Sequence, residues 1–236
     1  RISNLIPVTF FGLFFGLIGS FIFTIYHLAE ERRTKTIKLQ QEQCRLELKN
    51  LIAQINPHFL FNTLNSIASL IHQDADKAEQ MVHKLSNMFR YCLQSSDNQT
   101  VQLKKEIEII TQYLEIEKIR FADRLRYQMQ IEPECLPLQI PPLILQTLVE
   151  NGVKHGISPL LEGGRITVKA YIKNDKLCLS VSDTGMGFQV DQINSGFGLT
   201  AVKNILNLLY GNEHEFQILA NKDTEVRIVL PKDQSR

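Results

Sequence analysis

Polar side chains recur at helical spacing in the apolar segment QINPHFLFNTLNSIASLI. At about 100° per residue, His58, Asn62, Asn65 and Ser69 fall within about 60° of one another on one side of a helix. This stripe contains no lysine or glutamate, which usually fill a solvated helix face. It therefore indicates a functional face, and an ordinary wet face or a core histidine is the alternative.

His58 suits nucleophilic chemistry better than metal binding. With a reference pKa of about 6.5, a neutral imidazole is available near neutral pH, and one ring nitrogen can attack while the other keeps its proton. No second His or Cys lies near it in the sequence, which argues against a metal site. Pro57 favours a kink just before His58, through which an upstream signal could alter its presentation. We expect the opposite side of this helix to be buried, namely Leu60, Leu64, Ile67 and Ile71.

A second set of residues suits a magnesium nucleotide. The segment LVENGVKHG is predicted to be helical and carries Asn151, Lys154 and His155. An amide oxygen can bind Mg²⁺, which often bridges to substrate phosphates, and the two basic side chains could meet phosphate oxygens. The alternative for this segment is an amphipathic surface helix.

Two glycine pairs follow in the same half of the chain. In SVSDTGMGF a predicted strand ends at Asp183, whose carboxylate could accept a hydrogen bond from a base amino group. Gly185 and Gly187 come next and let backbone approach a ligand. Gly196 and Gly198 directly precede a predicted helix, whose N-terminal N–H groups suit phosphate. The spacing fits neither a P-loop nor a dinucleotide-binding fingerprint. A single pair is usually only a turn, but together with the Asn151 segment the two pairs predict a nucleotide pocket.

The first 28 residues differ in kind from the rest. From Ile2 to Leu28 there is no Asp, Glu, Lys or Arg, and a helix of about 20 such residues crosses a bilayer. Basic residues follow at once, which predicts that everything after about residue 28 lies in the cytoplasm. A signal peptide or a buried core helix fits this length less well. Because the chain starts at Arg1, we expect it to belong to a longer protein that senses a signal in or beyond the membrane.

The pattern after this span predicts helices and then strands. Residues 30–55 are expected to form a helix with a mostly apolar seam, typical of a short dimeric coiled coil, although a solvated linker helix is the alternative. Amphipathic helices are predicted at about 74–94 and 103–121. We then expect RITVKAYI to pair with LCLSVSD through the turn KNDK, and HEFQIL to pair with EVRIVLP. Two helical segments, about 141–156 and 198–210, complete an α/β sandwich.

Net charge and cysteine content say little about binding partners. The formal net charge of +1 provides no basic field that would indicate nucleic acid. The four cysteines stand singly, with no C-x-x-C pair, and are expected to be reduced thiols in a cytosolic compartment.

Four segments in this order resemble the H, N, G1 and G2 boxes of LytS-like sensor histidine kinases: QINPHFLFNTLNSI, PPLILQTLVENGVKHG, DTGMGF and GFGLTAV. The resemblance covers roughly residues 50–231. It implies a dimeric helical hairpin that forms a four-helix bundle in the dimer, and a Bergerat-type ATP-binding sandwich. With the N-terminal transmembrane helix predicted from composition, the expected fold class is α+β. The predicted division is a transmembrane helix at 1–28, a signalling linker at 29–55, dimerisation and phosphotransfer helices at 56–121 and an ATP-binding domain at 122–236.

The resemblance also implies residue roles. His58 would be phosphorylated, Asn151 would bind Mg²⁺ and Asp183 would contact adenine, supported by Thr224. The four glycines of the two pairs would shape the ATP pocket and its lid. Since Phe59 follows His58 where many histidine kinases have an acidic base, the base is unassigned. We hypothesise that Asn62 orients the imidazole or a hydrolytic water.

The implied function is that of a membrane-bound sensor kinase of a two-component system. It would act as a homodimer in the bacterial inner membrane and pass the phosphoryl group from His58 to an aspartate of a cytoplasmic response regulator, possibly of LytTR type. Any nucleic-acid contact would belong to that regulator.

Some residues depart from the family pattern. Gly152 replaces the usual alanine, Thr147 a proline and Asp223 a glycine, and KNIL replaces an arginine-containing segment after GFGLTAV. A non-catalytic membrane scaffold that binds ATP is therefore the alternative to a kinase. Nucleotide binding without phosphohistidine would favour it. A chaperone-like or topoisomerase-like ATPase of the same fold is a third reading, but it would not need His58 or explain the membrane span.

Overall fold

The computed structural model describes Glu30 and residues 57–95, 98–186, 197–220 and 223–232. The chain divides into two units, 1–54 and 55–236, and the description below concerns the second. The predicted membrane span at 1–28 and almost all of the predicted linker at 29–55 lie outside the described residues. Within the described ranges, no helix has both the length and the apolar character needed to cross a bilayer.

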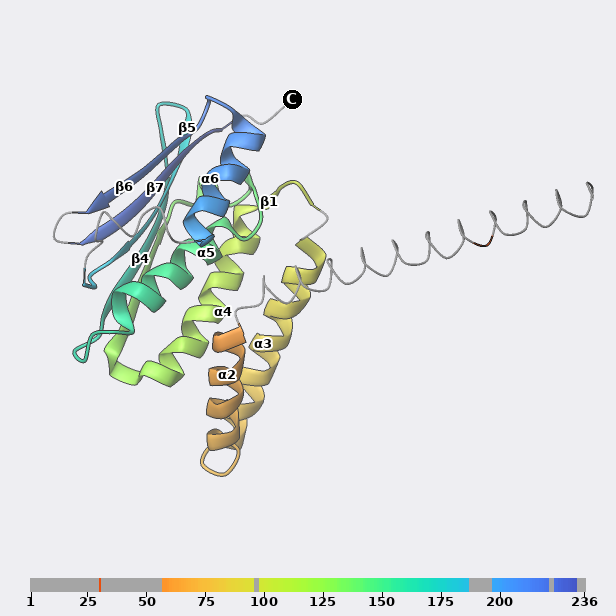
Figure 1. Cartoon of the computed structure of the whole chain (residues 1–236), viewed down its shortest axis with the longest axis vertical. Coiled ribbons are helices and arrows are strands. Elements are labelled where there is room, and N and C mark those ends of the chain that lie inside the picture. Colours follow the sequence, from red (N-terminus) through yellow and green to blue (C-terminus); the bar gives the residue numbers. More distant parts are fainter. Residues whose placement is uncertain (1–29, 31–56, 96–97, 187–196, 221–222, 233–236) are drawn as a thin grey trace, which may run out of the picture. The chain divides into compact units, whose positions relative to one another are not determined.

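Three helices open the unit: α2 (Pro57–Leu70), α3 (Ala75–Ser95) and α4 (Leu103–Phe121). Helices α2 and α3 form a hairpin, and α4 packs against both (Figure 1). The turn into α3 is closed by Asp74, whose Oδ1 accepts a hydrogen bond from the backbone N–H of Lys77 at 3.1 Å. This is the capping role for which a short acidic side chain is favoured at a helix start. The predicted helices at about 74–94 and 103–121 are confirmed.

The buried face of α2 agrees only in part with the one that the apolar pattern predicted. Ile67 is buried and Leu60 is partly buried, as expected, but Leu64 and Ile71 are 49% and 54% exposed. Phe59 and Thr63 are buried instead. The cause is α4, whose Tyr113 ring lies 5.0 Å from the Phe59 ring, centroid to centroid. Helix α2 therefore turns the residue after His58 inward, and part of its apolar surface stays open.

The second half of the unit is built on a five-stranded sheet in the order β2-β4-β5-β7-β6. The strands are β2 (Leu125–Ile131), β4 (Gly164–Lys173), β5 (Lys176–Asp183), β6 (Glu215–Ala220) and β7 (Thr224–Pro231). The two predicted hairpins are confirmed as β4–β5 and β6–β7, both antiparallel. In the first, Asn174 and Asp175 take φ values of 52° and 57°, as a two-residue hairpin turn requires.

Strand β2 was not predicted, and it pairs with β4 in parallel. Its sequence LRYQMQI alternates in burial but carries few β-branched residues, so its signal was weak. A small antiparallel pair, β1 (Val101–Gln102) with β3 (Gln139–Ile140), joins the start of α4 to the segment before α5. The short helices η1 (Ala122–Arg124) and η2 (Pro133–Cys135) flank β2.

Helices cover one face of the sheet (Figure 1). They are α4, α5 (Ile144–Asn151) and α6 (Phe197–Tyr210). On that face β7 buries alternate residues, which are Thr224, Val226, Ile228 and Leu230. The helix predicted at 141–156 is not continuous, because the α-helix ends at Asn151 and a π-helix, η3 (Gly152–Ile157), follows. Such π segments often occur at functional sites. One hydrophobic core runs from α2 to the sheet.

Candidate functional site

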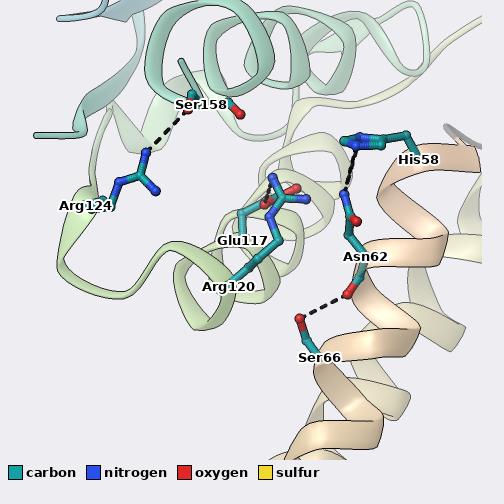
Figure 2. A network of polar contacts seen from close by, with 7 residues as sticks. All are labelled: His58, Asn62, Ser66, Glu117, Arg120, Arg124 and Ser158. Atoms are coloured by element: carbon teal, nitrogen blue, oxygen red, sulfur yellow. Dashed lines mark hydrogen bonds and ion pairs between the residues drawn. The ribbon is translucent and has the colours of Figure 1, made fainter. Parts of the chain in front are cut away.

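His58 lies in the first turn of α2 and is exposed. The amide nitrogen of Asn62 lies 3.1 Å from Nε2 and 3.3 Å from Nδ1 of the imidazole. Figure 2 shows the two side chains facing each other, with Ser66 one turn on and its hydroxyl donating to the Asn62 backbone oxygen at 3.0 Å. An amide N–H donates only to an unprotonated ring nitrogen, and here either ring nitrogen is close enough to accept. Asn62 thus holds the orientation of the His58 ring.

A buried ion pair on α4 is linked to the His58 region through Tyr113. Arg120 lies 2.8 Å from Oε2 of Glu117, whose side chain is only 3% exposed (Figure 2). Burial raises the pKa of Glu117 to about 7, while the charge of Arg120 and a hydrogen bond from Tyr113 oppose the rise. Tyr113 in turn contacts Phe59, the neighbour of His58. The sequence analysis did not single out this pair, although an acid and a base three residues apart on one helix are a recognisable signal.

Arg124 connects the end of α4 to the sheet half of the unit. Its guanidinium donates to the backbone oxygen of Leu160 at 2.6 Å. It also donates to the backbone oxygen of Ser158 at 3.4 Å, the contact drawn in Figure 2. Ser158 follows η3 directly and Leu160 lies two residues further on. Arg124, in η1 just after α4, therefore links this end of α4 to the segment that follows η3.

Asp183 ends β5, as predicted, and is 7% exposed. Its Oδ1 accepts a hydrogen bond from the backbone N–H of Gly185 at 3.0 Å. Burial raises the pKa of Asp183 to about 6, the Gly185 bond opposes this and the charge of Asp223 adds to it. Asp223, where the family usually has glycine, therefore makes this carboxyl easier to protonate. Thr224 is also buried and is the cross-strand partner of Asp183 on β7.

The Asp183 carboxyl lies against a glycine that the sequence analysis did not choose. A Cβ atom added to Gly156 would overlap the Asp183 carboxyl, and one added to Gly185 would overlap the backbone of Gly156. Glycine is therefore required at both positions for η3 and the end of β5 to approach each other. Gly156 was present in the segment LVENGVKHG, but only the tertiary contact gives it a role.

Asn151 is the last residue of α5 and is partly buried. Its Nδ2 atom is buried and has no hydrogen-bond partner within the described part of the chain. A Cβ atom added to Gly198, in the first turn of α6, would lie 3.1 Å from that Nδ2. The structure thus brings Asn151 and Gly198 together.

Of the other predicted nucleotide residues, two are exposed on η3 and two lie outside the described part of the chain. Lys154 and His155 are exposed on η3, where partial burial and then the neighbouring Lys154 lower the pKa of His155. Gly187 and Gly196 lie outside the described residues.

These residues fit a magnesium nucleotide. The buried Asp183 carboxyl could accept a hydrogen bond from a base. Beside the α6 N-terminus, the Asn151 Nδ2, which has no partner among the described residues, could donate to phosphate, and the Oδ1 of the same amide could bind Mg²⁺. Within residues 57–95, 98–186, 197–220 and 223–232, no three His, Cys, Asp or Glu side chains gather as a metal cluster. A cation here would therefore take most of its ligands from phosphate and water, as Mg²⁺ commonly does.

Comparison with known proteins gives matches over both halves of the unit. Residues 46–125 match the family described as histidine kinase, and residues 141–234 match the family of histidine kinase-, DNA gyrase B- and HSP90-like ATPases. The chain is 39% identical over 184 residues to the sensor histidine kinase BtsS of Escherichia coli strain K12, covering 78% of this chain and 33% of that protein. It is 38% identical over 204 residues to the sensor protein LytS of Staphylococcus epidermidis, covering 80% and 34%.

The chain thus spans about a third of the length of the curated relatives that it matches. Among solved structures, it is similar to the histidine kinase domain of the blue-light activated histidine kinase EL346 of Erythrobacter litoralis, with a TM-score of 0.48 and 17% identity. That match covers 71% of this chain and 81% of the other.

Proposed function

Because this chain belongs to the LytS-like family of sensor histidine kinases, we propose that it is the kinase portion of a two-component sensor. It uses ATP to phosphorylate His58 and then passes the phosphoryl group to an aspartate of a response regulator. The observation that carries this proposal is the exposed imidazole of His58, held by Asn62 at the start of α2, in a unit that also holds a buried carboxyl and an unpartnered amide suited to a nucleotide. The similarity to the sensor histidine kinase BtsS favours a kinase over a scaffold.

The residues of the sheet half would hold the nucleotide. Asp183 would accept a hydrogen bond from the adenine amino group, with Thr224 beside it. Asn151 would bind Mg²⁺, Lys154 and His155 would meet phosphate oxygens, and the glycine pairs would shape the pocket. The magnesium nucleotide supplies a transferable phosphoryl group whose charge is partly neutralised.

The chain's own contribution to the reaction is made by His58. The unprotonated ring nitrogen forms a bond to the γ-phosphorus, the bond from phosphorus to the β–γ bridging oxygen breaks, and ADP leaves with that electron pair. The other ring nitrogen keeps its proton during the attack. Asn62 assists by holding the orientation of the ring, and its contact with the attacking nitrogen must break before that nitrogen bonds to phosphorus.

The open apolar surface of the hairpin supports a homodimer. Phe61 and Leu64 on α2 and Val82 on α3 are 67%, 49% and 48% exposed. Burying them against a second copy would form a four-helix bundle. We propose the same division of the chain as the sequence predicted: membrane helix 1–28, linker 29–55, helices 56–121 and ATP-binding domain 122–236. We further propose that it acts from the bacterial inner membrane on a cytoplasmic regulator, possibly of LytTR type, and that it binds no nucleic acid itself.

The test is incubation of the whole chain with γ-labelled ATP and Mg²⁺. We expect retained label that is labile to acid in the wild type, none in His58→Ala, and normal label in His83→Ala, a matched control at an exposed histidine on α3. Equal label in His58→Ala and the wild type would refute the assignment.

A second variant separates phosphate donation from phosphate acceptance. Asn151→Ala should not label itself, because the Mg²⁺ ligand is lost, but its His58 should accept label in a mixed dimer with His58→Ala. Normal self-labelling of Asn151→Ala would refute the metal assignment, and absence of label in the mixed dimer would instead indicate transfer within one subunit.

A further inference from the structure

One buried carboxyl connects the hairpin to the nucleotide half of the unit. Glu106, in the first turn of α4, is 0% exposed. Its Oε1 accepts hydrogen bonds from the Tyr91 hydroxyl at 2.6 Å and from the backbone N–H of Leu143 at 2.7 Å. Its Oε2 accepts one from the backbone N–H of Leu145 at 3.1 Å. Glu106 therefore contacts both α3 and the start of α5.

Helix α5 has no cap of its own. Leu143 stands at the capping position with φ 63° and ψ 8°, in the left-handed region, and its side chain offers no acceptor. The first N–H groups of a helix need acceptors from elsewhere, and a negative charge is favoured there. The Glu106 carboxyl supplies these acceptors from another helix. Burial raises the pKa of this carboxyl, and the hydrogen bonds that it accepts oppose the rise and so favour the charged form.

Asn151 lies at the other end of this same helix. Helix α5 is 8 residues long, so the cap and the Asn151 amide are about 10 Å apart along one rigid element. If the hydrogen bonds from Glu106 to the first turn of α5 changed, the helix would shift and the Asn151 amide in its last turn would move with it.

Tyr91 brings the hairpin into this arrangement. Its hydroxyl bonds the same carboxyl oxygen as Leu143 N–H, so a displacement of α3 acts on the atom that caps α5. Tyr91 itself lies in a closely bonded turn, because its backbone oxygen accepts the Ser95 hydroxyl at 2.7 Å.

We propose that Glu106 is a positioning residue that sets the placement of Asn151 by capping α5, and that Tyr91 makes this placement depend on helix α3. The inference rests on the proposed function: its first half needs the proposed nucleotide site at Asn151, and its second half also needs phosphorylation of His58.

The first experiment measures Mg·ATP binding by titration calorimetry of the whole chain. Glu106→Gln keeps the size of the side chain but loses charge and one acceptor oxygen, and we expect its Kd to rise about tenfold, the size of one charge-assisted hydrogen bond. Glu108→Gln, an exposed change on the same helix, is the matched control and should bind like the wild type. A folded Glu106→Gln protein with a Kd within twofold of the wild type would show that Glu106 is merely structural.

The second experiment uses Tyr91→Phe, which leaves the Glu106 cap on α5 intact. We expect an unchanged Kd for Mg·ATP but a threefold to tenfold lower rate of His58 phosphorylation at saturating ATP, with Tyr127→Phe on β2 as the control. An unchanged rate would overturn the role of Tyr91, and this variant decides the matter if Glu106→Gln does not fold. If the wild type binds Mg·ATP but never labels His58, the proposed function fails, whereas the Glu106 binding result still stands.

Discussion

Asp183 and Thr224 stand directly opposite each other on neighbouring strands, and both side chains are buried at the end of the sheet where α5 ends and α6 begins. Residues opposite each other in an antiparallel pair point to the same face. The carboxyl and the hydroxyl therefore form one polar spot on the helix-covered face of an otherwise apolar sheet.

This spot predicts the effect of removing the charge. Asp183→Asn should weaken ATP binding at least tenfold at neutral pH, because hydrogen bonds to charged groups contribute about 1.5–3 kcal/mol. Calorimetric titration measures the change, with Asp175→Asn in the exposed β4–β5 turn as the control. Equal affinities of Asp183→Asn and the wild type would contradict the role of Asp183 as the base contact.

The same carboxyl predicts a pH dependence of stability. The pKa of Asp183 is raised from 3.8 to about 6, mainly by burial, so between these values the folded state binds more protons than the unfolded state. Its contribution to the free energy of unfolding must then fall as pH rises through this window and be lost above about pH 6.

Urea unfolding from pH 4 to pH 7 measures this dependence. We expect the unfolding free energy of the wild type minus that of Asp183→Asn to decrease as the pH rises. Other titrating groups, such as Glu117, cancel in that difference. A difference that stays constant or increases would contradict the prediction.

Gly152 offers a test of packing at the start of η3. Alanine, the usual family residue, would gain up to about 1 kcal/mol of helix propensity, but its Cβ would lie 2.9 Å from Cδ1 of Ile166. Ile166→Val removes that atom at a cost of about 0.5–1.5 kcal/mol. We therefore expect Gly152→Ala to stabilise the Ile166→Val protein more than the wild type.

A double-mutant cycle of chemical unfolding measures this coupling. The double variant should be more stable, by more than about 0.5 kcal/mol, than the sum of the two single changes predicts. Simple additivity of the two changes would mean that Ile166 does not restrict residue 152.

Asn62→Ala tests the contact that holds the imidazole. A neutral hydrogen bond contributes about 0.5–1.5 kcal/mol, so we expect His58 phosphorylation to slow about threefold to tenfold with an unchanged Kd for ATP. Asn65→Ala, on the same exposed stripe, is the control. Equal rates for the two alanine variants would exclude an orienting role for Asn62.

Much of this molecule could be predicted from the sequence because local spacing is informative over short distances. The helices at 75–95, 103–121 and 197–210, both hairpins, the strand end at Asp183 and the exposure of His58 follow from periodicity and turn residues. Their order along the chain also carries the family resemblance. Each of these features depends on neighbours within a few residues of one another.

Only the tertiary structure decided which surfaces meet. The inward turn of Phe59 depends on Tyr113, the need for glycine at 156 depends on Asp183, and the cap of α5 comes from Glu106 on another helix. The partners in these three contacts are 54, 27 and 37 residues apart in the sequence, as their residue numbers show. Burial and capping depend on distance in space, and a pattern read along one segment does not contain the partner that another segment supplies.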